Sequence, residues 1–233
     1  MGIEKFAYAG EAPVQGSPAT EIETLFWTHQ GVVVHKWLHY LPLYDRYLQP
    51  WKNRDLRLLE IGVSKGGSLG MWRRFFGDRA VVFGIDIDEN CLKYNGLDGQ
   101  VRIGSQDDPA FLRRVVAEMG GIDVVIDDGS HVSRHIRASF DVLFPLLSEG
   151  GLYIAEDLHT AYWPLYEGGY RRKSSFISVV KTMIDDMHHW YHGFGQQVTA
   201  ATGHVAALHI HDSIVVVEKR LVAAPRHTHR GSE

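Results

Sequence analysis

The sequence predicts an α/β fold built around a mostly parallel, seven-stranded sheet that ends in a β-hairpin. Two short apolar runs that stop at acidic residues flank a segment of helical periodicity within residues 124–157. An earlier apolar run enters a glycine-rich turn at residues 62–68. Near the C-terminus, two β-type runs meet at a tight turn at residues 211–213. Continuous apolar runs are typical of buried parallel strands, and a short polar turn between two runs indicates a hairpin.

The central unit, residues 124–157, is predicted to be a strand, a helix and a second strand. Its first run, VVI, leads into Asp127 and Asp128, and its second, LYIA, leads into Glu156 and Asp157. The segment between them carries apolar residues at helical spacing. A strand–helix–strand connection makes the strands parallel, so their carboxyl ends lie at one edge of the sheet. Ligands bind at this edge in open α/β sheets.

Three of these acidic residues are candidate metal ligands. If the two strands are neighbours, about 5 Å apart, Asp128, Glu156 and Asp157 converge. Crowded carboxylates repel one another unless a cation or protons lie among them. Because an all-oxygen set favours a hard ion over zinc, we expect these residues to bind Mg²⁺. The alternative is an exposed acidic edge that holds no ion.

The bulk properties exclude several classes of protein. A chain of 233 residues, 45% of them hydrophobic, suits one α/β domain with a full core. The net charge of −4 offers no basic surface for nucleic acid. The single cysteine, Cys91, cannot form an intramolecular disulfide and indicates a cytoplasmic location. Neither a membrane span nor a signal peptide is expected, because no apolar run is long enough and the N-terminus lacks an apolar region.

The first 50 residues are predicted to form an irregular arm followed by helical turns. Residues 35–49 are dense in aromatic side chains, among them Tyr44. They are expected to form an amphipathic helix that packs on the sheet. A second interpretation is a lid that supplies ring faces, including that of Tyr44, to a ligand. Both hold if one face of the helix packs and the other lines the site.

The glycine-rich turn is predicted to bind a nucleotide-like cofactor. A strand at residues 56–62 enters this turn, and a helix follows at residues 69–76. Glycine lets the backbone come close to a ligand, and the start of the helix offers free N–H groups. The spacing is G-x-x-x-G-G and no G-K-[ST] is present, which disfavours a dinucleotide or phosphate site. The residues assigned to the cofactor here are Glu60, Gly62, Ser64, Gly66 and Ser68, with Glu60 facing a cationic group of the ligand.

Acidic and amide residues at the ends of the next strands complete the predicted cofactor site. The strand at residues 80–86 ends in Asp86, followed by Asp88, at a position that suits ribose hydroxyls. The alternative is that Asp86 only caps a turn. Gln106 and Asp107 follow a strand at residues 101–105 and are expected to read an adenine edge. Asp127 is assigned to the cofactor site, and the alternatives are a supporting role behind it or a cap of the helix that starts near Ser133.

The last third of the chain is predicted to supply an acceptor pocket and to close the sheet. The loop after the acidic pair carries His159, Tyr162 and Trp163, which together with Tyr44 are the candidate substrate contacts. A long helix is expected at residues 173–190. Strands are expected at residues 204–211 and 213–219. Five strands alternating with helices, followed by a hairpin, is the strand inventory of the Rossmann-like class I methyltransferase fold.

Four motifs carry a resemblance to a known family. LLEIGVSKGGSLGMW, GIDID, IDDGSH and LYIAEDLHTAYW together resemble the Mg²⁺-dependent sugar O-methyltransferases of natural-product pathways, of the mycinamicin VI 2''-O-methyltransferase type. Cephalosporin hydroxylase-like proteins are relatives of this family. The resemblance extends over about residues 37–163. It implies an S-adenosylmethionine-dependent methyltransferase domain at residues 51–222, preceded by the arm and helical lid at residues 1–50 and followed by a disordered tail at residues 223–233.

The resemblance also implies cofactors and roles for individual residues. S-adenosylmethionine is the implied methyl donor, and a sugar hydroxyl of a saccharide, glycolipid or glycosylated natural product is the acceptor. Asp128, Glu156 and Asp157 are the implied Mg²⁺ ligands, and His131 is the implied general base beside Asp128. Mg²⁺ lowers the pKa of a bound hydroxyl, and histidine titrates near neutral pH. A homodimer or higher homo-oligomer is the habit of the family.

Several alternatives remain open at this point. His131 is otherwise a structural cap, and His159 is a second candidate for the base. On the same fold, the acceptor is otherwise a catechol-like compound or an antibiotic without a sugar. A binding module that has lost its chemistry conflicts with the intact acidic residues and His131. An NAD-dependent oxidoreductase conflicts with the glycine spacing.

Overall fold

A seven-stranded mixed sheet forms the centre of the protein, as the sequence predicts. The computed structural model describes residues 19–192, 197 and 199–231. The strands are β1 Arg57–Ile61, β2 Val81–Asp86, β3 Gln100–Ile103, β4 Ile122–Asp127, β5 Leu147–Ala155, β6 Val205–His211 and β7 Ile214–Lys219. Their order in the sheet is β3-β2-β1-β4-β5-β7-β6, with β1 to β5 parallel and β7 antiparallel to both of its neighbours.

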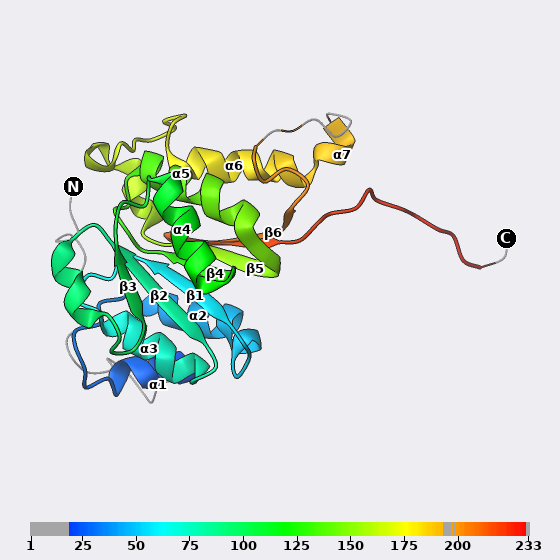
Figure 1. Ribbon diagram of the computed structural model, residues 1–233. Coiled ribbons are helices and arrows are strands. Elements are labelled where there is room, and N and C mark those ends of the chain that lie inside the picture. The colour runs from blue at the N-terminus through cyan, green and yellow to red at the C-terminus, as the bar shows by residue number, and fades with distance from the viewer. Residues whose placement is uncertain (1–18, 193–196, 198, 232–233) are drawn as a thin grey trace.

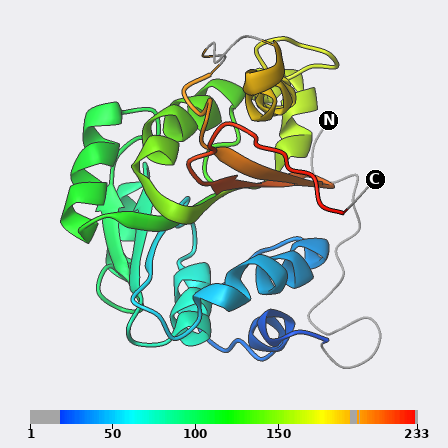
Figure 2. The same ribbon diagram turned by 90° about the vertical axis from the view of Figure 1, so that its right-hand side faces the viewer.

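Helices cover both faces of the sheet (Figures 1 and 2). The α-helices are α1 Glu21–Trp27, α2 Leu41–Leu48, α3 Gly67–Phe76, α4 Pro109–Met119, α5 Ser133–Leu143, α6 Phe176–Met187 and α7 His189–His192. Short 3₁₀ helices are η2 Leu38–Tyr40, η3 Gln49–Trp51, η4 Glu89–Tyr94, η5 Phe144–Leu146, η6 Leu158–Tyr162 and η7 Pro164–Tyr166. Helices α1 to α3 pack on one face, and α4 to α6 pack on the other.

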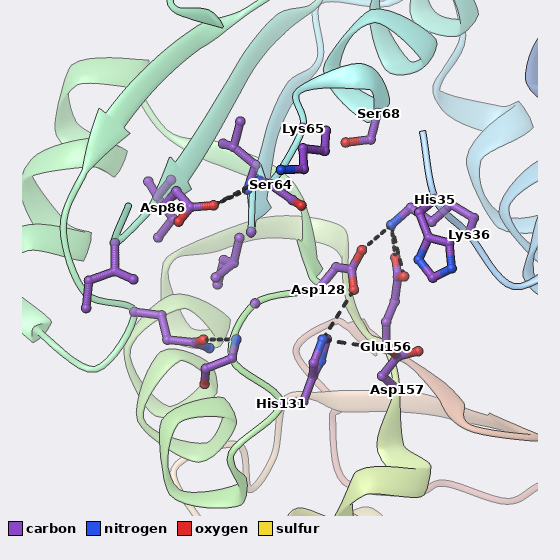
Figure 3. A pocket seen from close by; sticks show the side chains of 18 of the residues that line it. His35, Lys36, Ser64, Lys65, Ser68, Asp86, Asp128, His131, Glu156 and Asp157 are labelled. Carbon is purple, nitrogen blue, oxygen red and sulfur yellow. Dashed lines mark hydrogen bonds and ion pairs between the residues drawn. The ribbon is translucent and has the colours of Figure 1, made fainter. Parts of the chain in front are cut away.

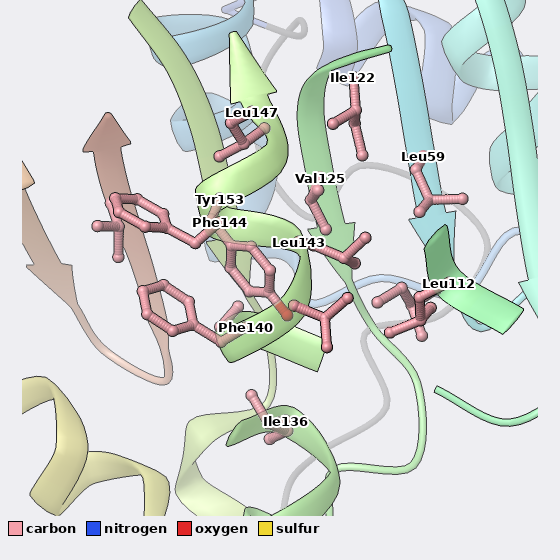
Figure 4. Packing of buried hydrophobic residues seen from close by; sticks show 14 of the residues in the cluster. Leu59, Leu112, Ile122, Val125, Ile136, Phe140, Leu143, Phe144, Leu147 and Tyr153 are labelled. Carbon is pink, nitrogen blue, oxygen red and sulfur yellow. The ribbon is translucent and has the colours of Figure 1, made fainter. Parts of the chain in front are cut away.

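Two hydrophobic clusters hold the layers together. On the α4–α6 side, Phe140 stacks on Phe144 with ring centroids 4.8 Å apart, and both lie against the buried side chains of β4 and β5 (Figure 4). On the opposite side, Tyr44 packs its ring edge against Trp72 of α3. The first cluster reaches from β2 to β6 and the second from β3 to β7, so the central strands are buried on both faces, as their apolar runs predict.

The register of the central strands confirms that the acidic residues share one edge. Strand β4 pairs with β5 in parallel, with Asp127 opposite Ala155. The N–H group of Glu156 donates to the carbonyl of Asp127 at 2.9 Å, and the N–H group of Asp128 donates to the carbonyl of Ile61 at 2.9 Å. The carboxyl ends of β1, β4 and β5 are therefore locked side by side.

Some predicted elements differ in extent. The helix expected at residues 35–49 begins only at Leu41, after the extended Trp37 and a 3₁₀ turn, because Pro42 favours the first turn of a helix. The helix expected at residues 173–190 begins at Phe176 and is interrupted at His188. Helix α4 begins at Pro109, and the carboxylate of Asp108 caps it by accepting from the N–H groups of Ala110 and Phe111.

The ends of the described chain differ in packing. Helices α1 and α2 contribute to the core on the α3 side. Residues 221–231 extend from the sheet without helix or strand, and most of them are exposed (Figure 1). The greater part of the predicted N-terminal arm, residues 1–18, lies outside the described residues. Within the described part of the chain, no helix is long and apolar enough to cross a membrane.

Candidate functional site

A cavity of about 380 Å³ lies at the carboxyl ends of β1, β2, β4 and β5 (Figure 3). Its floor comes from the turns that follow these strands, and its roof comes from residues 33–37. We call residues 33–37 the strap, because this extended segment crosses the strand ends. The strand order reverses at β1 and β4, and this switch point is where α/β sheets bind ligands.

Two glycines of the turn allow other backbone segments to pack closely against it. Gly62 has a φ of 94°, and a Cβ there would lie 2.1 Å from the carbonyl oxygen of Asp128. A Cβ on Gly67 would lie 2.3 Å from the carbonyl oxygen of Val32, immediately before the strap. The first glycine therefore joins β1 to the turn after β4, and the second lets the strap lie on the start of α3.

Asp86 both caps the turn and lines the cavity. Its Oδ2 atom accepts from the N–H groups of Val63 and Ser64, each at 2.9 Å. Its Oδ1 atom accepts from the N–H group of Asp88. A carboxylate has about four acceptor sites, so these three bonds leave capacity for a ligand hydroxyl. The turn-cap alternative for Asp86 is thus compatible with a ligand contact.

Half of the residues predicted to bind the cofactor line this cavity. Those that do are Gly62, Ser64, Ser68, Asp86 and Gln106. The other half lie behind the wall or beside it: Glu60, Gly66, Asp88, Asp107 and Asp127. Both sets of assignments remain predictions, and the structure adds that the second set does not line the cavity.

Glu60 and Asp127 are buried beneath the cavity. Glu60 is fully buried, and its carboxylate accepts from Ser68 Oγ at 2.6 Å and from Trp72 Nε1 at 3.0 Å. Asp127 accepts from Gln106, Ser139 and Tyr153. Burial is the main cause that raises the pKa of both carboxyl groups. Each carboxylate supports the floor from below.

The remaining three residues face other partners. Asp88 caps the first turn of η4 by accepting from the N–H group of Asn90. A Cβ on Gly66 would meet the ring of Tyr94, so this glycine makes room for that side chain. Asp107 accepts from Ser105 Oγ at 2.5 Å and pairs with His135 at 3.3 Å, and both of these partners line the cavity.

A buried lysine lies among the predicted metal ligands. Lys36, from the strap, places Nζ 2.6 Å from Oδ2 of Asp128 and 3.0 and 3.1 Å from the two carboxylate oxygens of Glu156 (Figure 3). It also lies 3.8 Å from Oε1 of Glu60. The side chain of Lys36 is 2% exposed. The sequence analysis did not identify this residue as part of the site.

The charges of this cluster determine its protonation. Burial by itself lowers the pKa of Lys36, but the attraction of Asp128, Glu156 and Glu60 outweighs it and raises this pKa well above the usual value. Lys36 is therefore an ammonium ion. Burial and the neighbouring charge of Asp128 raise the pKa of Glu156, and Lys36 acts in the opposite direction. The ammonium is the cation that lets these acidic residues share a buried site.

A second face of the cluster brings Asp128, Asp157 and His131 together. His131 Nε2 lies 3.8 Å from Oδ1 of Asp128 and 3.7 Å from Oδ2 of Asp157. One ligand atom from each of the three residues lies within 4.8 Å of the others. Imidazole nitrogen and carboxylate oxygen are both metal ligands. Asp128 and Asp157 thus meet as predicted, whereas Glu156 faces Lys36.

The backbone at this second face is held in an uncommon conformation. His131 has a φ of 58°, and Asp157 has a φ of 53°. The hydroxyl of Thr160 donates to the carbonyl of His131 at 3.1 Å, which ties the two loops together. Non-glycine residues in this region cost free energy and often occur at functional sites.

Comparison with known proteins identifies a domain match and homologues of the chain. Residues 59–158 match a family described as a methyltransferase domain. The 8-demethyl-8-alpha-L-rhamnosyl tetracenomycin-C 2'-O-methyltransferase of Streptomyces olivaceus is 38% identical over 199 residues, covering 79% of this chain and 52% of the relative. The mycinamicin VI 2''-O-methyltransferase of Micromonospora griseorubida is 34% identical over 214 residues, covering 86% of this chain and 52% of the relative. The chain is a homologue of these sugar O-methyltransferases.

A solved structure supports the same conclusion. The MycE methyltransferase of the mycinamycin biosynthetic pathway, in complex with Mg and SAH, superposes with a TM-score of 0.74 at 34% identity. The match covers 80% of this chain and 50% of MycE. The predicted class I methyltransferase fold and the family resemblance are therefore confirmed. The chain spans about half the length of the curated relatives it matches.

The four residues predicted to contact the acceptor do not line the cavity. Tyr44 is 1% exposed and packs within the core, so a direct contact with an acceptor is not available to it. His159 packs against Trp37 of the strap and against Trp163, with ring centroids 5.6 and 4.8 Å apart. Tyr162 is half exposed. His159 thus contacts the cavity-lining Trp37, and Trp163 packs behind His159.

The residues that the sequence analysis missed belong to two groups. The first is Lys36 of the strap; its neighbour Trp37 also lines the cavity, in agreement with the lid interpretation of residues 35–49. The second is the pair Ser130 and His135, whose Oγ and Nδ1 atoms are 2.8 Å apart at the opposite wall. Ser130 lies within the DDGSH motif and was detectable there. The strap carries no local signal except an unexplained lysine between aromatic residues.

Proposed function

We propose that this protein is a metal-dependent O-methyltransferase that transfers a methyl group from S-adenosylmethionine to a sugar hydroxyl. The observation that carries the proposal is the convergence of Asp128, His131 and Asp157 at the mouth of the cavity. The homologues are named for methylation of sugar hydroxyls. SAH, the product that S-adenosylmethionine leaves after methyl transfer, is bound with Mg in MycE.

The cavity fits a methyl donor of this kind. Asp86 lies at the wall with acceptor capacity for ribose hydroxyls, and Ser105 and Gln106 lie at the next strand end. Gln106 donates to Asp127 and accepts from the N–H group of Ser130, which fixes its amide at the cavity wall. Its contact with an adenine edge stays part of the proposal, and the neighbouring Ser130 and His135 offer further polar atoms there.

The acidic face fits a divalent cation. Asp128 and Asp157 offer carboxylate oxygens to the ion, and Nε2 of His131 lies beside them, 3.8 and 3.7 Å away, where it stays free to act as a base. When bound there, Mg²⁺ supplies a positive charge that lowers the pKa of an acceptor hydroxyl. Glu156, the third predicted ligand, lies at the same strand end but accepts from Lys36. Its assignment as a ligand remains part of the proposal, with Lys36 as its present partner.

His131 is proposed as the base that removes the acceptor proton. Its Nε2 atom faces the carboxylates of Asp128 and Asp157, at 3.8 and 3.7 Å, at the face proposed to hold the ion and the acceptor. The acceptor oxygen then bonds to the methyl carbon while the methyl–sulfur bond breaks, so the proton ends on His131. Holding both reactants in one cavity supplies most of the acceleration. Lys36 is a poor base, because its ammonium is engaged by acidic side chains.

A non-sugar acceptor is the second candidate. Catechol-type enzymes commonly use a lysine base, and the structure does bring Lys36 to the carboxylates. The engaged, charged state of Lys36 favours the histidine and hence the sugar acceptor. The oligomeric state and the cytoplasmic location expected from the sequence remain predictions.

The experiment that tests the proposal measures donor binding and turnover separately. Calorimetry should show binding of S-adenosylmethionine to the wild-type protein. Methyl transfer to a panel of glycosylated natural products should be abolished by EDTA and by Asp128→Ala. The matched control is Asp141→Asn, which removes an acidic side chain from the outer surface of α5. Absence of donor binding would reject the proposal, and turnover that is insensitive to EDTA would reject its metal.

A further inference from the structure

The carboxylates of Asp128 and Glu156 face two positive partners: the ammonium of Lys36, and the divalent ion proposed to bind at the face formed with His131 and Asp157. The three donors of the Lys36 ammonium are directed at Oδ2 of Asp128 and at both oxygens of Glu156, at 2.6 to 3.1 Å. The remaining oxygen of Asp128 faces His131 at 3.8 Å. Asp128 is therefore shared between the lysine and the face that can hold a cation.

The two positive partners exclude each other in part. A divalent ion bound through Asp128 lies close to the ammonium of Lys36, and like charges repel strongly in a buried site. The oxygens of Glu156 are occupied as long as the ammonium stays. The lysine thus weakens binding of the ion at Asp128 and withholds Glu156 from it.

We propose that Lys36 is an internal competitor of the divalent ion, which keeps the acidic residues assembled in its absence and lowers their affinity for it. The inference rests on the proposed function only in naming Mg²⁺ as the ion. Lys36 is a positioning residue, since it acts through Asp128 and Glu156.

Competition between Lys36 and the ion should also affect the strap, which forms the roof of the cavity. Lys36 belongs to the strap, and its neighbours His35 and Trp37 line the cavity. The side chain of Lys36 anchors the strap to the ends of β4 and β5. An ion that displaces the ammonium therefore releases one anchor of the roof, so binding of the ion and closure of the strap are coupled.

If Lys36 competes with the ion, removing its ammonium should strengthen ion binding. If Lys36 only supported the fold, the same change should weaken ion binding. Without the ammonium, buried carboxylates lack a counter-charge and the ion-free protein loses stability. The vacated oxygens then bind the ion more tightly, because its competitor is gone. A lysine that only supports the fold would weaken ion binding when removed.

The test uses calorimetry with MgCl₂ and thermal unfolding of the full chain, with and without EDTA. For Lys36→Gln and Lys36→Met, Mg²⁺ should bind at least tenfold more tightly than in the wild type. The melting temperature should fall in EDTA, and Mg²⁺ should raise it more than in the wild type. The control is Lys219→Met, since this buried ammonium donates to the carbonyls of Pro145 and Leu147, away from the cavity. Its Mg²⁺ affinity should equal that of the wild type.

Unchanged or weaker Mg²⁺ binding by the folded Lys36→Gln protein would overturn the inference. If Lys36→Met folds only when Mg²⁺ is present, the competition is supported, because the ion then replaces the lost charge. Binding of S-adenosylmethionine by the wild-type protein separates the two proposals. Donor binding together with unchanged Mg²⁺ affinity in Lys36→Gln removes the competitor role alone, whereas loss of donor binding in the wild type removes the proposed function.

Discussion

The hydroxyl of Tyr40 and the main chain and side chain of Asp157 form a reciprocal contact. The hydroxyl lies 3.0 Å from Oδ1 of Asp157, to which it donates, and it accepts from the N–H group of the same residue at 3.2 Å. Burial, followed by the charge of Asp157, raises the pKa of Tyr40, so the hydroxyl keeps its proton. The segment before α2 therefore fixes the orientation of an acidic residue that follows β5.

Removal of this hydroxyl should loosen Asp157. Tyr40→Phe is expected to weaken Mg²⁺ binding and to lower kcat/KM by about tenfold, which corresponds to a hydrogen bond of about 1.4 kcal/mol. The matched control is Tyr47→Phe on α2, because that hydroxyl contacts His211 and not the acidic cluster. Equal kinetics and equal Mg²⁺ affinity in the two variants would show that Tyr40 does not orient the site.

Gly67 and Gly70 both lie in α3, but only Gly67 contacts the backbone next to the strap. Alanine substitutions at the two positions should therefore differ in their effect on donor binding and stability. Gly67→Ala places a Cβ 2.3 Å from the backbone carbonyl of Val32, so the strap must move away. Donor affinity should fall at least tenfold, with a loss of about 1–3 kcal/mol in stability, as for overpacked sites. Calorimetry with S-adenosylmethionine measures the first effect and urea unfolding the second.

Gly70→Ala is the control for this substitution. Its Cβ would meet only the end of the Asp98 side chain, at 2.9 Å, which can rotate away. Alanine favours a helix over glycine by about 1 kcal/mol, so this variant should keep its donor affinity and its stability. If Gly67→Ala binds the donor as well as Gly70→Ala does, the close approach of the strap is not required.

The sequence predicted the sheet because its strands carry strong local signals. Strands β1, β4 and β5 each contain a short apolar run next to glycine or acidic residues, and the connection rules then place β4 beside β5. The convergence of Asp128 and Asp157 follows from this adjacency. The start of β5 was missed because Gly150 and Gly151 interrupt the apolar run.

The direction in which each side chain points was harder to predict than the sheet itself. Successive residues of a strand point to opposite faces. Asp127, the last residue of β4, enters the core on the α5 side, while Asp128 faces the cavity. Glu60 likewise points toward Ser68 and Trp72 of α3. The sequence does not show which face each strand end presents. Asp127 and Glu60 were therefore both assigned to the cofactor.

Lys36 could not be predicted from local pattern at all. It lies 92 residues before Asp128 and 120 residues before Glu156 in the chain. Periodicity and spacing describe contacts within and between adjacent elements, whereas this ion pair depends on how the strap crosses the finished sheet. Only the packed structure brings the three residues together.

The network around Asp127 predicts a variant with a stability defect and little effect on chemistry. The hydroxyls of Tyr153 and Ser139 donate to its buried carboxylate at 2.5 and 2.7 Å. Tyr153→Phe removes one donor from a buried charge and should cost about 1–3 kcal/mol of stability. Donor affinity should stay within about threefold, since Asp127 lies below the cavity. The control, Tyr170→Phe, changes an exposed ring and should be neutral.

The defect of Tyr153→Phe should depend on pH with a defined sign. Burial already raises the pKa of Asp127, and the lost hydrogen bond raises it further. The penalty belongs to the ionised form, so it is greatest above this raised pKa and is relieved as protonation proceeds at lower pH. The difference in melting temperature from the wild type should therefore be larger at pH 8 than at pH 5. A difference that grows toward acid pH would contradict this account of the network.

Cys91 provides a probe of the turn beneath the cofactor site. Burial, followed by the charge of Asp86, raises the pKa of its thiol to about 11, and Sγ donates to the carbonyl of Ser64 at 3.3 Å. At pH 8, ionisation alone should slow its reaction with a thiol reagent by about 200-fold relative to a free thiol of pKa about 8.5. The rate should rise about tenfold for each pH unit up to pH 11. Because the raised pKa favours the folded form only until the thiol ionises, this contribution to stability should be lost between pH 9 and 11.

The measurement follows the reaction of this single cysteine in the native protein and in urea. Unfolding exposes the thiol and restores its ordinary pKa, so the urea sample should react at the rate of a model peptide. S-adenosylmethionine should slow the native reaction further, since the donor is proposed to lie over Ser64 and Asp86 and to hold the turn in place. Fast reaction of the native protein at pH 7 would mean that the thiol is exposed or ionised, and the packing of η4 against the glycine turn would then be wrong.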